Sequence, residues 1–277
     1  MKKLFYIVAA LLLTAHATSY AQTGKQNNAI KQIPVVLNGN WCETGYIQDL
    51  AVTKSPAQSQ GKLKSIVAIN INTKEIKNNR LEVNAPGVHE GGSFIIDFKK
   101  KAITGNAFVT DIVDYEHAEE GGYFYELGYV STPKKGSAAD ISLVIYHFNK
   151  NKMLIDKTIY SKTATGQYDA LQYMVSKTLI AGTYKGSDAD GKLLQLIFTS
   201  TGDVKGLAGI KKYYVQTDFV VSGQNSTDAM CFDIQTNKQH CYIFEITGST
   251  LKLYEEIKNA RDYSVKKGEL FYTLTRQ

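Results

Sequence analysis

Short runs in which apolar and polar residues alternate extend over most of the chain after residue 35. The runs are rich in Val, Ile, Tyr, Phe and Thr, and turn-forming Gly, Asn, Asp and Ser separate them. Alternation with a period of two predicts β-strands that bury one face. In the first half we expect strands at 39–48, 63–71, 80–84, 93–98, 102–114, 122–131, 141–149 and 153–161. In the second half we expect them at 182–186, 193–200, 204–208, 213–221, 228–235, 240–247, 250–256 and 269–276.

Each half thus holds about eight short antiparallel strands with hairpin-length connections. This pattern predicts an all-β fold of two tandem up-and-down barrel-like units, closed or nearly closed. Regularly spaced short strands also fit β-sandwich units, so the sandwich stays open as an alternative. We expect the first barrel-like domain at 35–164 and the second at 181–277.

Residues 165–180 interrupt the strand pattern. Tyr168, Leu171, Val175 (or Met174) and Leu179 recur at helical spacing. We expect a short amphipathic helix here, which either links the two units or plugs the end of a barrel.

The N-terminus has the pattern of a bacterial signal peptide. Two lysines precede an apolar run from Leu4 to Leu13, and small residues follow up to Ala21. The run is shorter than the roughly 20 residues that a transmembrane helix needs. We therefore expect cleavage after Ala21, removal of residues 1–21, a flexible lead-in at 22–34, and a periplasmic or secreted product. An uncleaved N-terminal anchor is the alternative.

The charge distribution argues against nucleic-acid binding, and the hydropathy argues against an integral membrane span in the mature chain. The formal net charge of +6 falls to about +4 without Lys2 and Lys3, and the remaining lysines are interspersed with acidic residues. A phosphate-tracking stripe needs a denser basic run, so we expect no nucleic acid to bind. No other stretch is long and apolar enough to span a membrane, so we expect no integral membrane span after cleavage.

Two of the three cysteines are placed to form a disulfide. Cys231 and Cys241 flank the segment FDIQTNKQH, which has the composition of a turn between two strands. If Thr236 is the centre of the hairpin, the two cysteines lie opposite each other. An exported chain meets an oxidising compartment, so we expect this disulfide. Cys42 is left over, either as a buried free thiol or as an intermolecular one.

The two units begin alike. Gly39-Asn40-Trp41 and Gly182-Thr183-Tyr184 both place an aromatic residue two positions after a glycine, at the start of the first strand of a unit. The first of these resembles the opening motif of the lipocalins and the wider calycin group. Thr217-Asp218-Phe219 also resembles the Thr-Asp-aromatic motif of that group, at a much shorter distance from its glycine.

The resemblance implies a structural role for these aromatic residues. In that group the aromatic side chain packs under the closed end of the barrel, often beneath an Arg or Lys of the last strand. Trp41 would then plug the first barrel, under Lys157 or Lys162. Tyr184 would plug the second, under Arg276. A cation over an aromatic face contributes about 0.5–2 kcal/mol.

Enzyme motifs are mostly missing from the chain. His89, His117, His147 and His240 are each isolated in sequence. His117 lies in the segment DYEHAEEGG, which is either a cation or acid-base site at a loop rim or, as we favour, a solvated acidic hairpin end. We therefore expect no catalytic residues, no metal and no cofactor, and a hydrolase that uses the acids near His117 ranks third among the function classes.

Tyrosine is unusually frequent, with 18 residues against 11 Phe and one Trp. A tyrosine combines an apolar ring with a hydroxyl, which suits the walls of a half-wet cavity and contact surfaces. The candidate ligand-binding residues are Tyr123, Tyr125, Tyr129, Tyr214 and Tyr242. Ordinary strand propensity explains these tyrosines equally well.

Two functions follow as expectations. The leading one is an exported, non-enzymatic protein that binds a small, partly apolar or amphipathic ligand inside or at the mouth of a barrel. The alternative is a protein-protein interaction module, such as an inhibitor, adhesin or envelope-complex subunit, that uses tyrosine-rich strands. A barrel of about eight strands has room either for core side chains or for one small ligand, so the filling of the barrel separates these two functions.

Overall fold

The fold was taken from a computed structural model that describes residues 33–87, 90–136, 138–163, 169–219, 227–259, 261 and 264–277. The expected signal peptide at 1–21, nearly all of the lead-in, and the beginning of the expected helix at 165–180 lie outside the described residues. The described residues form one compact unit. No helix in the described ranges is both long enough and apolar enough to cross a membrane.

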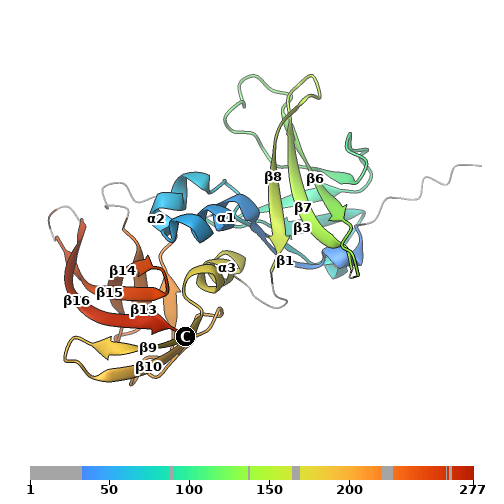
Figure 1. The fold of residues 1–277 in the computed structure, drawn as a ribbon. Helices are drawn as coiled ribbons and strands as arrows, with labels where there is room; N and C mark the ends of the chain where they lie inside the picture. Colours follow the sequence, from blue (N-terminus) through green and yellow to red (C-terminus); the bar gives the residue numbers. More distant parts are fainter. Residues whose placement is uncertain are drawn as a thin grey trace, which may run out of the picture. The chain divides into compact units, whose positions relative to one another are not determined.

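The first sheet is a closed antiparallel barrel in the order β1 to β8, with β8 pairing back onto β1 (Figure 1). Its strands are β1 (Gly39–Glu43), β2 (Ala68–Ile71), β3 (Arg80–Asn84), β4 (Ser93–Asp97), β5 (Ala107–Thr110), β6 (Phe124–Thr132), β7 (Asp140–Phe148) and β8 (Leu154–Lys162). The longest strands of this barrel, β6 to β8, form an up-and-down hairpin series with one register shift, at His147/Phe148. The prediction of an all-β fold with barrel-like antiparallel units is confirmed.

Two helices stand where the sequence analysis places strand and loop. The predicted strand at 39–48 ends at Glu43, because α1 (Thr44–Thr53) begins at the next residue. The Glu43 side chain accepts a hydrogen bond from the Tyr46 N–H and so caps the helix. The shorter helix α2 (Pro56–Ser59) follows, with Ser55 as its N-cap and Pro56 at its first position. The predicted strands at 63–71 and 102–114 are also too long, and the structure has only the shorter β2 and β5 there.

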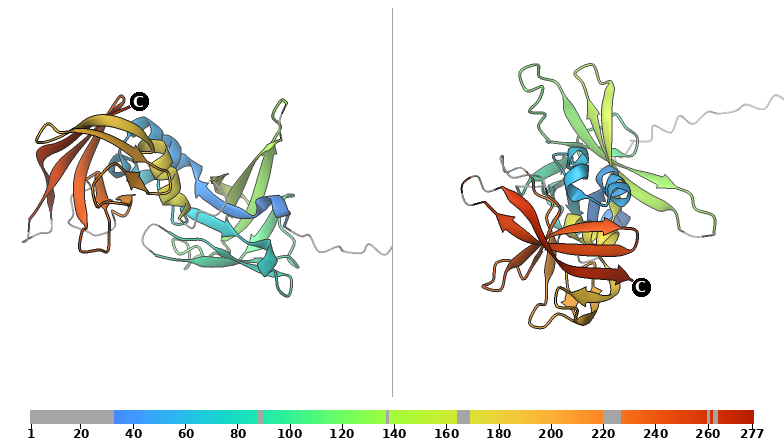
Figure 2. Two further views of the ribbon diagram at one scale, coloured as in Figure 1. Left: turned by 90° about the horizontal axis from the view of Figure 1, so that it is seen from below. Right: turned by 60° about the vertical axis from the view of Figure 1, so that its left-hand side comes forward.

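The second sheet also has eight strands, in the order β11-β10-β9-β16-β15-β14-β13-β12, and Figure 2 shows it as one strongly curved sheet. Its strands are β9 (Gly182–Asp188), β10 (Leu193–Phe198), β11 (Val204–Lys205), β12 (Tyr213–Val215), β13 (Ala229–Phe232), β14 (His240–Thr247), β15 (Thr250–Lys258) and β16 (Val265–Arg276). The predicted strands at 204–208 and 213–221 are longer than the observed β11 and β12.

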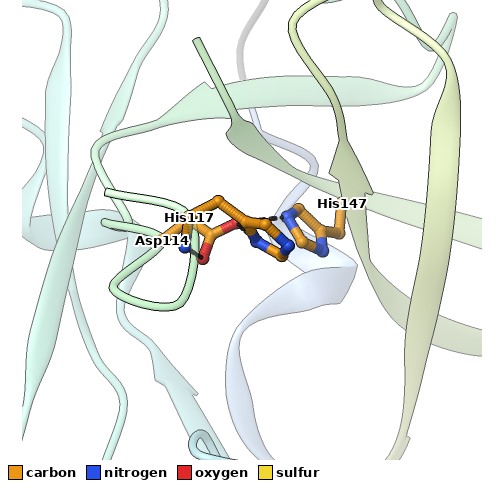
Figure 3. Close-up of side chains that lie close together, drawn as sticks. All are labelled: Asp114, His117 and His147. Atoms are coloured by element: carbon orange, nitrogen blue, oxygen red, sulfur yellow. Dashed lines mark hydrogen bonds and ion pairs between the residues drawn. The ribbon is translucent and has the colours of Figure 1, made fainter. Parts of the chain in front are cut away.

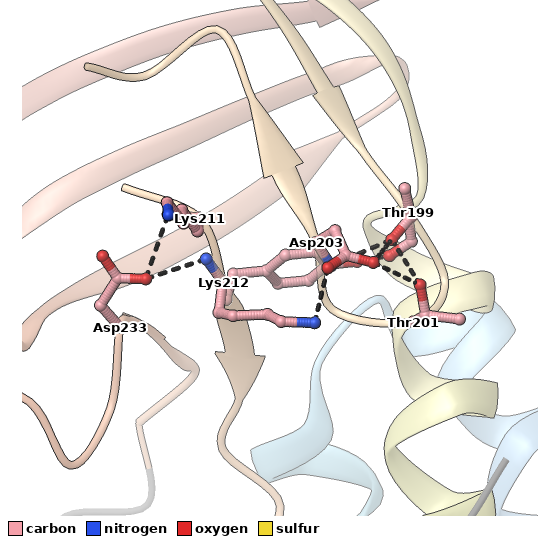
Figure 4. Close-up of polar contacts among 7 residues, drawn as sticks. Thr199, Thr201, Asp203, Lys211, Lys212 and Asp233 are labelled. Atoms are coloured by element: carbon pink, nitrogen blue, oxygen red, sulfur yellow. Dashed lines mark hydrogen bonds and ion pairs between the residues drawn. The ribbon is translucent and has the colours of Figure 1, made fainter. Parts of the chain in front are cut away.

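The edge strands of the second sheet almost close it. The N–H of Val204 donates to the Lys211 carbonyl at 2.9 Å, and the N–H of Tyr213 donates to the Gly202 carbonyl at 2.8 Å. The Asp203 side chain accepts a hydrogen bond from Lys212 Nζ across the same place, and Asp233 binds the Lys212 N–H from the β13 side (Figure 4). This unit is therefore a sheet curled until its two edges meet.

Alternation along the strands fills both units with side chains. Trp41, Leu81, Ile96 and Leu143 are among the fully buried members of one cluster in the first barrel. Ile69 and Ile71, Leu127 and Ile145, and Tyr160 complete the same packed core. Large apolar side chains thus occupy the barrel axis.

The second core contains residues from well outside its own sheet. Tyr184, Phe198, Phe232 and Phe244 pack there with helix α3 (Ala170–Leu179). Asp169 caps α3, and its buried face includes Leu171, Val175 and Leu179, as the helical spacing predicts. Residues of α1 and the surrounding segment, including Cys42, Tyr46 and Leu50, belong to the same cluster.

The disulfide prediction is confirmed. Cys231 lies opposite Cys241 in the β13–β14 register, and the two are bonded. Cys42 is free and buried.

Candidate functional site

The first barrel has two chemically different ends. At one end Trp41 of β1 pairs with Lys162, the last residue of β8. At the other end three residues lie side by side across β6, β7 and β8, because Tyr125 pairs with His147 and His147 pairs with Asp156. Tyr125 and His147 are each two positions from a core residue of the same strand, Leu127 and Ile145, so their side chains lie on the same, inner face, at the rim.

The loop between β5 and β6 brings a second histidine and a carboxylate to this rim. Asp114 and His117 both lie in this loop. Asp114 Oδ1 accepts hydrogen bonds from the N–H groups of Glu116 and His117, at 3.0 and 3.1 Å. Asp114 Oδ2 lies 2.8 Å from His117 Nδ1 and 2.8 Å from His147 Nε2 (Figure 3). Two imidazole nitrogens therefore converge on one carboxylate oxygen.

A tyrosine ring stacks on the face of each imidazole. The Tyr123 ring stacks on His117 with centroids 4.3 Å apart and planes inclined by 9°. The Tyr125 ring stacks on His147 at the same distance with an angle of 12°. Asp156 Oδ1 lies 3.5 Å from the second nitrogen of His147. Asp114, His117, Tyr123, Tyr125, His147 and Asp156 are called the rim cluster from here on.

The centre of the rim cluster is buried and its edge is open. The Asp114 side chain is 4% exposed, whereas that of His117 is 33% exposed. Burial acts to raise the pKa of Asp114, but the hydrogen bonds from His117 and His147 outweigh it, so the pKa lies below its usual value. Burial, together with the charge of Asp114, raises the pKa of Tyr125 to about 12. Asp114 is therefore a carboxylate anion that faces one nitrogen of each imidazole.

The structure separates the five candidate ligand-binding tyrosines. Tyr123 and Tyr125 belong to the rim cluster. Tyr129 lies further along β6, opposite Leu143, and packs against the barrel core. Tyr214 is on β12 of the second sheet, and Tyr242 is buried in the second core against Phe232 and Tyr272. The tyrosines thus form no single wall.

His147 and Asp156 are the residues of the rim cluster that the sequence analysis did not select, and His147 is the central one. It follows His117 by thirty positions, and its neighbours on β7 are ordinary strand residues. Its place on the inward face, in phase with Leu143 and Ile145, was the available signal. A polar residue in an otherwise apolar inward series is a reason to search for partners.

Each unit also carries a cation over a buried aromatic ring, and in the first barrel this pair lies at the end opposite the rim cluster. Lys162 Nζ lies 5.3 Å from the centroid of the Trp41 ring and donates to the Val36 carbonyl at 2.7 Å. In the second unit the Arg276 guanidinium lies 5.4 Å from the Tyr184 ring. Arg276 Nε donates to the Tyr184 hydroxyl at 3.0 Å, and its Nη2 donates to the Leu179 carbonyl at 2.5 Å. These contacts are structural, since the rings are buried.

Two surface hollows lie on outer faces of the sheets. One, of about 470 Å³, is lined by polar residues of β2 to β4 and their connections, including Asn70, Glu82 and Asn84. The other, of about 690 Å³, lies over β9, β10 and β16, beside Lys185, Gln195 and Thr273. Lys185, Gln195 and Thr273 alternate with the inward Tyr184, Leu196 and Leu274, so this second hollow does not enter the core.

Comparison of the chain with models of protein families, with curated proteins and with solved structures finds no match.

Proposed function

We propose that the chain is an exported, non-enzymatic binding protein that holds a small, partly apolar ligand at the rim cluster of its first barrel. The observation that carries this proposal is the pair of tyrosine-histidine stacks at an open barrel end whose interior is filled. The lipocalin-like or calycin-like character of the barrel is part of the same proposal.

The filled core argues for the mouth rather than the interior. An eight-stranded barrel that contains Trp41, Phe94, Phe108 and Tyr160 in one packed cluster leaves no room on its axis for a ligand of drug size. At the rim, by contrast, the rings of Tyr123 and Tyr125 are only partly buried. They offer an apolar face and a hydroxyl to the same ligand.

The surroundings of the rim fit a ligand with both apolar and polar parts. Val113 and Tyr115, in the loop that carries Asp114 and His117, are 55% and 84% exposed. Exposed apolar groups of this size beside fixed polar atoms are the usual composition of a small-molecule site.

Native mass spectrometry of protein purified from the cells that make it tests the proposal. We expect wild type to carry an organic adduct, and we expect Tyr123→Ala and Tyr125→Ala to lose it. Tyr254→Ala is the matched control, because Tyr254 is a partly exposed tyrosine on β15 of the second sheet. A wild-type chain that is detected only at its bare mass, or an adduct that all variants retain, would contradict the proposal.

One observation favours the alternative, a protein-protein interaction module. Met153, Leu154, Ile155 and Ile159 are 58%, 51%, 46% and 40% exposed along β8 and its turn. Adjacent exposed apolar residues on one strand are typical of a contact surface. A protein that co-purifies with wild type but not with Ile155→Ser/Ile159→Ser, together with a bare chain mass, would favour this function over the first.

A further inference from the structure

The geometry points to a binding site for a divalent transition metal ion at Asp114, His117 and His147. One potential ligand atom from each of the three residues lies within 4.8 Å of the other two (Figure 3). The three come from two separate segments, the β5–β6 loop and β7, so the fold and not sequence proximity brings them together. Such a site goes beyond the proposed small-molecule binding, because a metal ion can bind whether or not a ligand covers the rim.

The existing distances need little change to admit an ion. Zinc lies about 2.0–2.2 Å from imidazole and carboxylate ligands, so two ligands at a tetrahedral centre are about 3.4 Å apart. The contacts from Asp114 Oδ2 to His117 Nδ1 and to His147 Nε2 are 2.8 Å each. Widening them by about 0.6 Å is a small side-chain rotation for ligands of this kind.

The carboxylate is already fixed in a one-oxygen geometry. Both N–H donors of the loop, from Glu116 and His117, bind Asp114 Oδ1. Oδ2 is thereby turned toward the two imidazoles. Asp114 is buried, so this orientation has little freedom to change.

The imidazoles have the surroundings of metal ligands. A ligating histidine usually faces a carboxylate or carbonyl with its other ring nitrogen, which sets the tautomer and the orientation of the ring. Asp156 Oδ1 lies 3.5 Å from His147 Nδ1 and is placed for that role. The stacked rings of Tyr123 and Tyr125 restrain both imidazoles further.

His147 also stands between two carboxylates, which favours a cation in the cluster. A neutral imidazole has one N–H and can therefore donate to only one carboxylate. Its Nε2 lies 2.8 Å from Asp114 Oδ2, whereas its Nδ1 lies 3.5 Å from Asp156 Oδ1, so the single N–H serves Asp114 when no ion is bound. A metal ion bound at Nε2 would replace that hydrogen bond and leave the Nδ1–H free to donate to Asp156.

The donor set selects the class of metal. Two imidazole nitrogens and one carboxylate oxygen suit zinc, copper, nickel or iron, whereas calcium and magnesium require oxygen ligands. Three protein ligands leave a fourth position open to water or to a donor atom of a bound molecule. His117 is the most exposed of the three and lies on the side open to solvent.

Calorimetric titration of chelator-treated protein with zinc chloride alone tests the site. We expect wild type to bind one zinc ion per chain. We expect His117→Gln and Asp114→Asn to bind zinc at least about tenfold more weakly, because the loss of an outer hydrogen-bond partner alone already lowers metal affinity about 10–100-fold. His240→Gln is the matched control, because His240 also lies beside a carboxylate, with Nε2 3.1 Å from Glu255 Oε2, on the second sheet. We expect its zinc affinity to equal that of wild type.

Two further results make the outcome decisive. Circular dichroism identifies any variant that has lost its fold, and His117→Gln, in a loop, is the variant whose result counts if Asp114→Asn unfolds. The visible spectrum of the cobalt-loaded protein should show imidazole-bound, four-coordinate cobalt and should change in His117→Gln.

No zinc binding by wild type, or equal binding by wild type and His117→Gln, would overturn the site and leave a hydrogen-bonded cluster. Neither result depends on an organic adduct, so the small-molecule proposal stands or fails separately.

Discussion

Two glycines leave room for the cations that cover the buried aromatic rings. A Cβ on Gly39 would meet Lys162 Cε at 3.3 Å, and a Cβ on Gly182 would meet Arg276 Nε at 3.2 Å. Gly39 also has a φ of +120°, which other residues rarely adopt. The first strands of the two units thus share one arrangement. A glycine leaves space for the side chain of a Lys or Arg from the last strand of the unit, and that side chain lies over the aromatic residue two positions after the glycine.

Loss of the second cation should destabilise the fold measurably. Arg276→Ala removes hydrogen bonds to the Tyr184 hydroxyl and to the Leu179 carbonyl, which is in the last turn of α3. We expect a decrease of about 1–3 kcal/mol in the free energy of unfolding, from a charged hydrogen bond and the ring contact. Urea unfolding followed by circular dichroism measures it, with Lys266→Ala, an exposed position on the same strand, as the control. If Arg276→Ala changed the free energy of unfolding by less than about 0.5 kcal/mol, the contacts of Arg276 would make no measurable contribution to stability.

Cys42 should be chemically silent in the folded protein. Its side chain is buried, and burial raises the pKa of the thiol well above its usual value, so almost no thiolate forms near neutral pH. We expect no reaction with a thiol reagent such as dithionitrobenzoate in buffer, and one equivalent in denaturant without reductant. Fast labelling of the native protein would place Cys42 at an accessible surface instead.

At the scale of single residues, sequence was informative where partners lie at fixed places on strands. The Gly-x-aromatic openings and the last-strand positions of Lys162 and Arg276 are visible in the chain, and the structure places the members of each pair together. The approach of His117 to His147 has no such marker. It depends on the path of the β5–β6 loop over the rim and on the register of β7, and both are decided by tertiary packing.

At the scale of elements, helices account for the main errors. Trp41, Cys42 and Tyr46 continue a strand-like composition, yet the chain turns into α1 at Thr44 because α1 buries Tyr46 and Leu50 on one face. That four-residue spacing was available in the sequence, but the cap, Glu43, is not one of the preferred N-cap residues. The start of α2, a serine followed by proline, carried a recognisable helix signal that strand periodicity obscured.

Two carboxylates support the seam where the β11 and β12 edges of the second sheet meet. Asp203 accepts hydrogen bonds from Lys212 Nζ at 2.5 Å and from Thr201 Oγ1 at 2.7 Å, next to the backbone pair that joins the β11 and β12 edges (Figure 4). Asp233, from the β13–β14 loop, accepts from the N–H groups of Lys211 and Lys212. Side chains thus reinforce the place where the strand ladder is shortest.

Acid should weaken this seam. The hydrogen bonds from Lys212 and Thr201 lower the pKa of Asp203 from its ordinary value of 3.8. A carboxylate whose folded pKa is depressed stabilises the fold above the unfolded value, and that contribution is lost as the pH falls through the lower, folded pKa. Since the Asp203 side chain is 41% exposed, the contribution should be at most about 1 kcal/mol.

Urea unfolding at about pH 6 and about pH 3 separates this contribution from the general effect of acid. We expect Asp203→Asn to be less stable than wild type at the higher pH and to approach it at the lower pH. Asp190→Asn, an exposed position in the β9–β10 turn, should follow wild type at both values. A constant difference between Asp203→Asn and wild type at the two pH values would exclude the charge of Asp203 as the cause.

At the scale of the whole molecule, one core extends across the predicted domain boundaries. Cys42, Tyr46 and Leu50 belong to the cluster that contains Tyr184, Phe244 and Leu274, and α1 contacts α3 directly. The Ala57 N–H also donates to Asp228 Oδ1 at 2.8 Å. Strand alternation predicted two barrel-like units, but it could not predict this packing, because the contacts come from the helices inserted between strands.

This shared core leads to a prediction that reaches from the first half of the chain to the second. Leu50 is fully buried on α1, so Leu50→Ala should decrease the free energy of unfolding by about 2–5 kcal/mol. Because Leu50 packs in the second core, amide exchange should accelerate in β14 and β15 as well as near α1. Hydrogen exchange with mass spectrometry locates the effect, and Val52→Ala, 82% exposed on the same helix, should leave both regions unchanged. Acceleration confined to residues before 164 in Leu50→Ala would mean that the two sheets unfold independently despite their common core.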